Sequence, residues 1–190
     1  MQLILASSSP RRKELLKMLG IEPKIIVSHV DENQLPDEPV EIYLRRVSIA
    51  KGKAVYQDDF FDIPVISSDT IVWCDNLVIG KPRDREEAAR FLMMLSGNVH
   101  DVLTGLAIHY RGESHYEYAR TRVEFSEINE EELNYYLAHE HYMDKAGAYA
   151  IQGLASAFVK RIDGCYFNVM GFPVNIFYQV MKKLGIELFK

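Results

Sequence analysis

The chain has 190 residues, enough for one domain, or for two tightly joined lobes, with a sizeable core. Its 48% apolar and 26% charged residues are typical of an ordinary globular protein and exclude a disordered or fibrous chain. The 22 Lys and Arg against 27 Asp and Glu give a net charge of -5, so we expect no nucleic-acid polymer or anionic lipid as partner. A polyanionic ligand would need a local cationic pocket.

Cysteine content and hydropathy bear on the cellular compartment. Cys74 and Cys165 are too few for a disulfide framework and are not spaced as a metal-binding pair. The apolar residues 1–6 lack a basic start and are soon followed by Pro10 and basic residues, unlike a secretory signal. There is no run of about 18 apolar residues that could span a membrane. We therefore expect a cytoplasmic protein without a membrane partner.

The first part of the chain is expected to alternate short strands with helices. Residues 2–6 predict a buried strand, after which Ser9 can cap a helix with Pro10 at its first position and Gly20 just past its end. A second strand is expected over residues 24–28. The helix after it shows an apolar face formed by Val40, Tyr43, Leu44, Val47, Ala50 and Ala54. Its basic side chains are expected to point outward: Arg45, Arg46, Lys51 and Lys53.

The rest of the chain predicts hairpins interleaved with helices. Residues 64–73 predict a strand rich in β-branched residues that turns at Asp75-Asn76. Two helices begin with a residue followed three places on by glutamate: Asp84 with Glu87, and Asn129 with Glu132. Further strands are expected over residues 99–110, 116–125 and 158–162, and a last helix towards Lys183. This alternation predicts an α/β fold with a mixed, partly antiparallel sheet flanked by helices.

The segment Ser7-Ser8-Ser9-Pro10-Arg11-Arg12 lies at the predicted turn from strand to helix. It places hydroxyl groups, backbone N–H groups and two guanidiniums at a helix N-terminus, where partial positive charge favours anions. Arginine can bind phosphate oxygens through two donors at once. The segment therefore indicates a phosphate site, although a capped helix with exposed arginines would show the same pattern.

Ser68-Asp69-Thr70 interrupts a strand that is otherwise apolar. A carboxylate there is costly unless it is paired, hydrogen-bonded or bound to metal. Asp69 would suit Mg²⁺, which prefers oxygen ligands, and Glu32 in the loop after the second strand could supply another carboxylate. Two simpler interpretations stay open: Asp69 bonded to nearby backbone, and a loop acid at position 32 that is only solvated.

Two later loops carry candidate polar groups. Lys81, in Gly80-Lys81-Pro82, could reach a phosphate as a point charge, although the segment is not a P-loop because Pro82 stands where Ser or Thr should follow the lysine. Gln152 ends a run of charged and small residues that begins at Asp144. Its amide has the donor and acceptor atoms needed to read a pyrimidine edge, yet a buried glutamine that satisfies loop backbone would look the same.

Together these residues closely resemble the Maf family of nucleotide pyrophosphatases over nearly the whole chain. The order and spacing of the motifs make the resemblance specific. The matching segments are Leu5-Ala6-Ser7-Ser8-Ser9-Pro10-Arg11-Arg12, Ser68-Asp69-Thr70, Gly80-Lys81-Pro82, Leu95-Ser96-Gly97 with His100 and Thr104, Asp144-Lys145-Ala146-Gly147, Gln152-Gly153, and Asn168 to Pro173.

The resemblance implies a single domain over residues 1–190 that folds like the inosine triphosphate pyrophosphatases, with two lobes around a deep cleft, and often a homodimer. It also implies a nucleoside triphosphate substrate, release of pyrophosphate, and a divalent metal, Mg²⁺ with Mn²⁺ or Co²⁺ as substitutes. By matching position, Asp69 becomes the catalytic carboxylate and Glu32 its partner in holding the metal. Phosphate contacts match Ser7, Arg11, Lys51 and Lys81, and base selection matches Arg12, Thr70 and Gln152.

Within the family, Ser-Pro-Arg-Arg together with Gln152 resembles the dTTP/UTP branch rather than the branch that acts on 7-methyl-GTP. We therefore expect hydrolysis of dTTP and UTP, with CTP or modified pyrimidine nucleotides as further candidates, as house-cleaning of the nucleotide pool. The alternative is a nucleotide-binding regulator that acts through a protein partner, which the family's link with septum formation in cell division suggests. Release of pyrophosphate separates the two.

Overall fold

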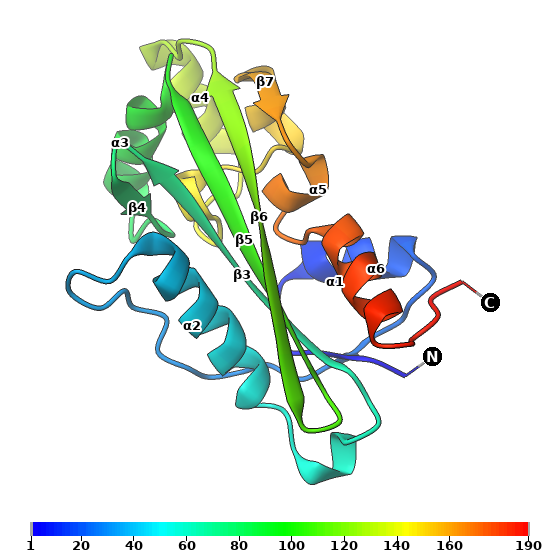
Figure 1. Cartoon of the computed structure of the whole chain (residues 1–190). Helices are drawn as coiled ribbons and strands as arrows, with labels where there is room; N and C mark the ends of the chain where they lie inside the picture. Colours follow the sequence, from blue (N-terminus) through cyan, green and yellow to red (C-terminus); the bar gives the residue numbers. More distant parts are fainter. Residues whose placement is uncertain (1, 190) are drawn as a thin grey trace. The chain divides into compact units, whose positions relative to one another are not determined.

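The computed structural model describes residues 2–189 and has the mixed α/β fold that the sequence predicts (Figure 1). Within these residues a seven-stranded sheet has the order β2-β1-β3-β5-β6-β7, and β4 pairs with β3 off this path. β1 runs parallel to β2 and β3, whereas the β3–β4 and β6–β7 pairs are antiparallel. The strands are β1 (Ile4–Leu5), β2 (Lys24–Ile25), β3 (Val65–Cys74), β4 (Leu77–Ile79), β5 (Val99–Tyr110), β6 (Glu113–Phe125) and β7 (Val159–Asp163).

The longer helices lie where the sequence predicts them. Together with one short helix, α5, they are α1 (Pro10–Met18), α2 (Val40–Lys53), α3 (Arg85–Leu95), α4 (Glu130–His139), α5 (Tyr166–Val169) and α6 (Val174–Lys183). α5 and the 3-10 turns at Asp58–Phe60, Ala146–Ala148 and Gly153–Ala157 were not expected, because a single turn is too short to show helical periodicity. In the described part of the chain, no helix has the length and apolar character needed to cross a bilayer.

Side chains at the helix starts confirm the predicted signatures. Asp84 Oδ1 accepts the backbone N–H of Glu87 at 2.7 Å at the start of α3. At the start of α4, Asn129 and Glu132 each accept the other's backbone N–H at 2.9 Å, a complete capping box. Ser9 is the N-cap residue of α1, but its side chain makes no capping hydrogen bond.

The described chain divides into two compact units. Unit 1 comprises the residues up to Asp69, residues 104–119 and the residues from Gly171 onward, and unit 2 comprises residues 70–103 and 120–170. β3, β5 and β6 therefore each contribute residues to both units. A single domain over residues 1–190 stays a prediction.

In unit 1, α2 packs closely against the sheet. Its predicted apolar face is buried at Val40, Tyr43, Leu44 and Val47. Ala50 is only half-buried, and Ala54, the C-cap residue at the end of the helix, is exposed, contrary to the prediction. A Cβ on Gly52 would lie 2.3 Å from the His109 ring and 2.6 Å from Ser67 Oγ. The backbone of α2 therefore approaches β3 and β5 so closely at Gly52 that no side chain fits.

In unit 2, one face of the sheet forms the core and the other faces outward. Alternation along β6 shows this, because Val123 and Phe125 are buried whereas Arg122 and Glu124 are more exposed. The core joins β5 and β6 to α3 and α4 through Leu92, Leu95, Val102, Val123, Phe125, Leu133, Tyr136 and Leu137.

His100 is a buried histidine of this core. Only 1% of its surface is exposed, and its Nε2 lies 2.7 Å from the Tyr149 hydroxyl. The Phe125 ring packs edge-on against it, with the ring centroids 5.0 Å apart. Burial lowers the pKa of His100 to about 4, although the charge of Asp101 acts in the opposite direction. The folded state therefore holds this imidazole neutral.

We predict that His100 makes the protein less stable as the pH falls from about 6.5 to about 4. His100 takes up a proton near pH 6.5 in the unfolded chain but only near pH 4 in the folded state. Its contribution to the free energy of unfolding is therefore complete above pH 6.5 and is lost as the pH falls towards 4. Between pH 7 and pH 5, the free energy of unfolding should fall by about 2 kcal/mol more in the unmodified protein than in His100→Asn, measured by urea unfolding. The exposed His139, changed to Asn, is the control. Equal pH dependence of His100→Asn and the unmodified protein would contradict the prediction.

Candidate active site

Alternate residues of β3 face opposite sides of the strand within unit 1. Ser67 Oγ donates to the backbone carbonyl of Ser48 in α2 at 2.7 Å, and Asp69 faces the same helix. Ser68, between them, points the other way and donates to the Gly171 carbonyl at 3.4 Å. The two-residue period of a strand therefore directs the carboxylate of the predicted Ser68-Asp69-Thr70 motif towards α2.

Lys51 of α2 bridges two carboxylates. Its Nζ lies 2.6 Å from Asp69 Oδ1 and 2.8 Å from Glu32 Oε2. The side chains of Lys51 and Asp69 are 8% and 10% exposed, and that of Glu32 is 44% exposed. The expectation that Lys51 points outward is wrong, because it lies one helical turn after Ser48, on the face of α2 that meets β3. Asp69 is thus stabilised by a buried cation.

Other side chains of α2 hold the loop that carries Glu32. Tyr43 Oη donates to the backbone carbonyl of Glu32 at 2.8 Å. Arg46 donates to the carbonyl of Asn33 at 2.8 Å and to both carboxylate oxygens of Glu38 at 2.7 Å. The hydrogen bonds from Arg46 are the main reason that the pKa of Glu38 is lowered to about 2. Glu32 therefore belongs to an anchored loop and is not merely solvated.

The turn before α1 brings Ser7 and Arg12 together. Ser7 Oγ accepts hydrogen bonds from the Ser9 N–H at 3.2 Å and from Arg12 Nη1 at 3.1 Å. Arg12 Nε donates to the Gly171 carbonyl at 2.9 Å, and Ser68 donates to the same oxygen. Arg12 is therefore held in place by the backbone and by Ser7, and it is not a freely exposed arginine.

The environment of Arg12 lowers the pKa of its guanidinium. Burial is the largest cause; the charge of Asp69 opposes it, that of Arg11 adds to it, and that of Glu32 opposes it. Arg12 therefore lies within electrostatic reach of Arg11, Glu32 and Asp69, and Lys51 pairs with both carboxylates. We refer to these five residues of unit 1 as the charge cluster. Its cations suit phosphate oxygens and its carboxylates suit a metal ion.

The carboxylates of the charge cluster fit a divalent metal. Among residues 2–189, no group of three or more His, Cys, Asp or Glu side chains is arranged to hold a metal ion. Asp69 and Glu32 instead offer two carboxylates that already share one cation, Lys51. Mg²⁺ commonly binds through one or two carboxylates and takes its other ligands from water and substrate phosphates. The donor set therefore suits a divalent metal whose remaining ligands are water and phosphate.

The remaining predicted site residues, Thr70, Lys81 and Gln152, belong to unit 2. Thr70 follows Asp69 in β3 and is half-buried, whereas Lys81 and Gln152 are exposed. The Gly80 carbonyl accepts the Gly147 N–H at 3.0 Å, so the loop of Lys81 contacts the predicted Asp144–Gly147 segment. The structure thus joins two of the motifs within unit 2, while Ser7 and the charge cluster gather in unit 1.

Glu140 holds the backbone beside Gln152. Its Oε2 accepts the Leu154 N–H at 3.1 Å, and a Cβ on Gly153 would lie 2.6 Å from the same oxygen. Gly153 also has φ +75°, a left-handed conformation that favours glycine. Because Gln152 is exposed, the interpretation that it is a buried glutamine satisfying the loop is wrong. The support that Glu140 gives to this loop has no signal in the local sequence, because Glu140 and Leu154 are distant in the chain.

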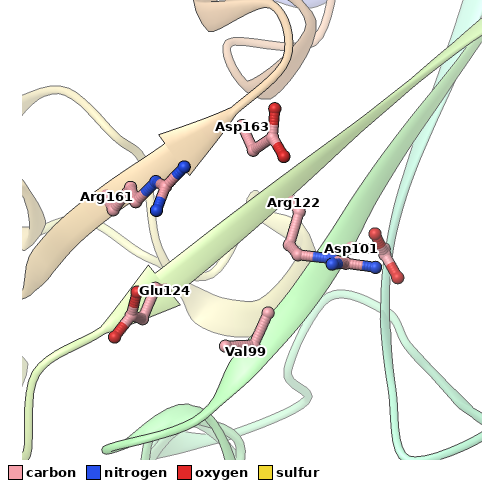
Figure 2. Close-up of a pocket in the computed structure, with 6 residues that line it drawn as sticks. All are labelled: Val99, Asp101, Arg122, Glu124, Arg161 and Asp163. Carbon is pink, nitrogen blue, oxygen red and sulfur yellow. The ribbon is translucent and has the colours of Figure 1, made fainter.

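A pocket of about 560 Å³ lies on the outward face of the sheet in unit 2 (Figure 2). In the register of β6 and β7, Arg122 lies opposite Asp163 and Glu124 lies opposite Arg161. Because opposite charges alternate on adjacent strands, the pocket presents no single sign of charge to a polyphosphate. The lining, none of which the sequence marked as a site, is Val99, Asp101, Arg122, Glu124, Arg161 and Asp163.

Comparison with known proteins agrees with the geometry. Residues 2–184 match the family model of the Maf-like proteins. The dTTP/UTP pyrophosphatase of Geobacillus sp. (strain WCH70) is 46% identical over 97% of this chain and 98% of that protein, and the dTTP/UTP pyrophosphatase of Syntrophomonas wolfei is 42% identical over 98% and 99%. The Staphylococcus aureus Ham1 protein shares the fold, with a TM-score of 0.57 and 11% identity over 97% of this chain and 100% of that one. The chain therefore belongs to the Maf family.

Proposed function

We propose that this protein hydrolyses dTTP and UTP to the monophosphate and pyrophosphate. Full-length similarity to relatives that are named dTTP/UTP pyrophosphatase supports the proposal. The observation that carries it is the pairing of the buried Lys51 with the buried Asp69 and with Glu32, within a cluster that also includes Arg12. Such a cluster supplies both cations for a triphosphate and carboxylates for a metal ion.

In the proposed reaction, the side chains of unit 1 bind the triphosphate and neutralise its negative charge. Arg11 and Lys51 bind phosphate oxygens, and Ser7 contributes a hydroxyl. Together with Arg12, these cations neutralise the charge that develops on the departing pyrophosphate. Asp69 and Glu32 would hold Mg²⁺, or Mn²⁺ or Co²⁺ in its place, and such a metal would supply Lewis-acid polarisation of phosphate and lower the pKa of water. Asp69 orients the attacking water and accepts its proton.

We propose that Arg12, Thr70 and Gln152 select the base and that Lys81 contacts a phosphate. The exposed amide of Gln152 can both donate and accept, as a pyrimidine edge requires. The exposed Lys81 presents its ammonium as a point charge. CTP and modified pyrimidine nucleotides belong in the substrate panel, because an amide alone does not distinguish among pyrimidines.

We further propose that the protein acts in the cytoplasm, as a homodimer, on free nucleotides and not on nucleic-acid polymers. Free Cys74 and Cys165 suit a reducing compartment, and the net charge of -5 suits a small ligand better than a polymer. No feature of the described residues favours a regulator of septum formation over an enzyme. Purified protein that binds nucleotide without releasing pyrophosphate would favour the regulator.

Replacing Asp69 by Asn should lower the kcat for pyrophosphate release from dTTP by about 10²–10⁴-fold, because the amide cannot accept a proton and holds a cation poorly. Thermal unfolding should show that the variant still folds. Asp62→Asn removes an exposed carboxylate of unit 1, which pairs with Arg111, and serves as the matched control with unchanged kcat. Undiminished turnover of Asp69→Asn would reject the catalytic role.

Replacing Gln152 by Ala should lower kcat/KM for dTTP and UTP roughly tenfold more than for GTP, because a hydrogen bond to the base is lost. Arg12→Ala should also change the order of preference. The measurement is pyrophosphate release from dTTP, UTP, CTP and GTP, with phosphate measured separately. Gln57→Ala, at an exposed glutamine of unit 1, is the control. Equal losses with all four nucleotides would mean that neither residue reads the base.

A further inference from the structure

Lys51 engages the two carboxylates that would hold the metal. One ammonium contacts Asp69 Oδ1 at 2.6 Å and Glu32 Oε2 at 2.8 Å, with the pair of Lys51 and Asp69 almost fully buried. Asp69 comes from β3 and Glu32 from the loop that Tyr43 and Arg46 anchor. The carboxylates of two separate segments thus both contact the ammonium of Lys51.

A divalent cation requires the same oxygen atoms. Carboxylate oxygens are the ligands that Mg²⁺ prefers, and an ammonium uses the same lone pairs for its hydrogen bonds. Lys51 already neutralises part of the repulsion between Asp69 and Glu32, which a metal would otherwise relieve. Binding of the metal and pairing of Lys51 with these oxygens therefore compete. The competition is a coupling free energy: the lysine weakens metal binding, and the metal weakens the ion pairs of the lysine by the same amount.

A lysine can change partner more easily than most cations. Its ammonium is a compact charge on a flexible four-carbon stem with three rotatable donors. Once its carboxylates are engaged by a metal, a buried ammonium needs another anion, because an unpaired buried charge is costly. The triphosphate of the nucleotide is such an anion. Arg12 adds a second positive charge to the same cluster of unit 1.

We propose that Lys51 is an internal competitor of the metal: in the metal-free protein it binds Asp69 and Glu32, and it exchanges them for substrate phosphate when metal and nucleotide bind together. The proposal rests on the proposed function, because it uses the same carboxylates and the same triphosphate. It makes the metal bind weakly to the free protein and tightly in the presence of nucleotide. The lysine thus couples the two binding events.

The test measures Mn²⁺ binding to the full chain without nucleotide, by electron paramagnetic resonance and by calorimetry at constant pH. Lys51→Met keeps the length of the stem and removes the charge, so the Kd for Mn²⁺ should fall by about tenfold. Charge-retaining Lys51→Arg should bind Mn²⁺ more weakly than Lys51→Met. Lys53→Met, at an exposed lysine of the same helix, should bind Mn²⁺ as the unmodified protein does.

A second readout keeps the test independent of activity. The rise in the midpoint of thermal unfolding on adding Mn²⁺ should be larger in Lys51→Met than in the unmodified protein, because only the variant has two carboxylates without their lysine. Unchanged or weaker Mn²⁺ binding in Lys51→Met, or no binding by either protein, would overturn the proposal. Tighter binding in the variant, in a protein that releases no pyrophosphate from any nucleotide, would support the competition and reject the proposed function.

Discussion

The ion pair between Lys51 and Asp69 is the constraint on which the rest of unit 1 depends. A carboxylate at 10% exposure is stable only with a cation and good hydrogen bonds, and Lys51 is the cation that α2 delivers. Because the same ammonium binds Glu32, one positive charge ties together β3, α2 and the loop between β2 and α2. The contact acts together with the hydrogen bonds by which Tyr43 and Arg46 anchor that loop and with the strand period that directs Asp69 towards α2.

The elements of the fold were predictable where local signals are strong. Proline at the start of α1, the capping residues of α3 and α4, and the turn at Asp75 and Asn76 are read from adjacent residues. Two members of the charge cluster were also predictable as unusual residues, because Asp69 interrupts an apolar strand and Arg12 follows a strand-to-helix turn. In both cases the signal is contained within a few neighbouring positions.

The contacts that hold the site residues in place were not predictable. They join residues that are distant in sequence or are not spaced as neighbours on a helix. The helical periodicity predicted Lys51 on the exposed side of α2, because charged residues are assigned to the exposed face of a helix. The pattern contains no information about a carboxylate on another element. Arg46 and Glu38 are joined across a loop, and Glu140 reaches Leu154 from the end of α4. Each of these contacts exists only once the chain has folded.

The close approach at Gly52 has a consequence for how the site tolerates change. The position of Lys51 depends on the distance between α2 and the strands β3 and β5. That distance is short because Gly52, the residue after Lys51, has no side chain. A larger residue there would displace the helix or the side chains of His109 and Ser67. A displaced helix would carry the ammonium away from both carboxylates, although every charged group of the cluster would still be present. A substitution at position 52 would therefore disturb the charge cluster without altering a polar residue, because what matters there is the absence of a side chain.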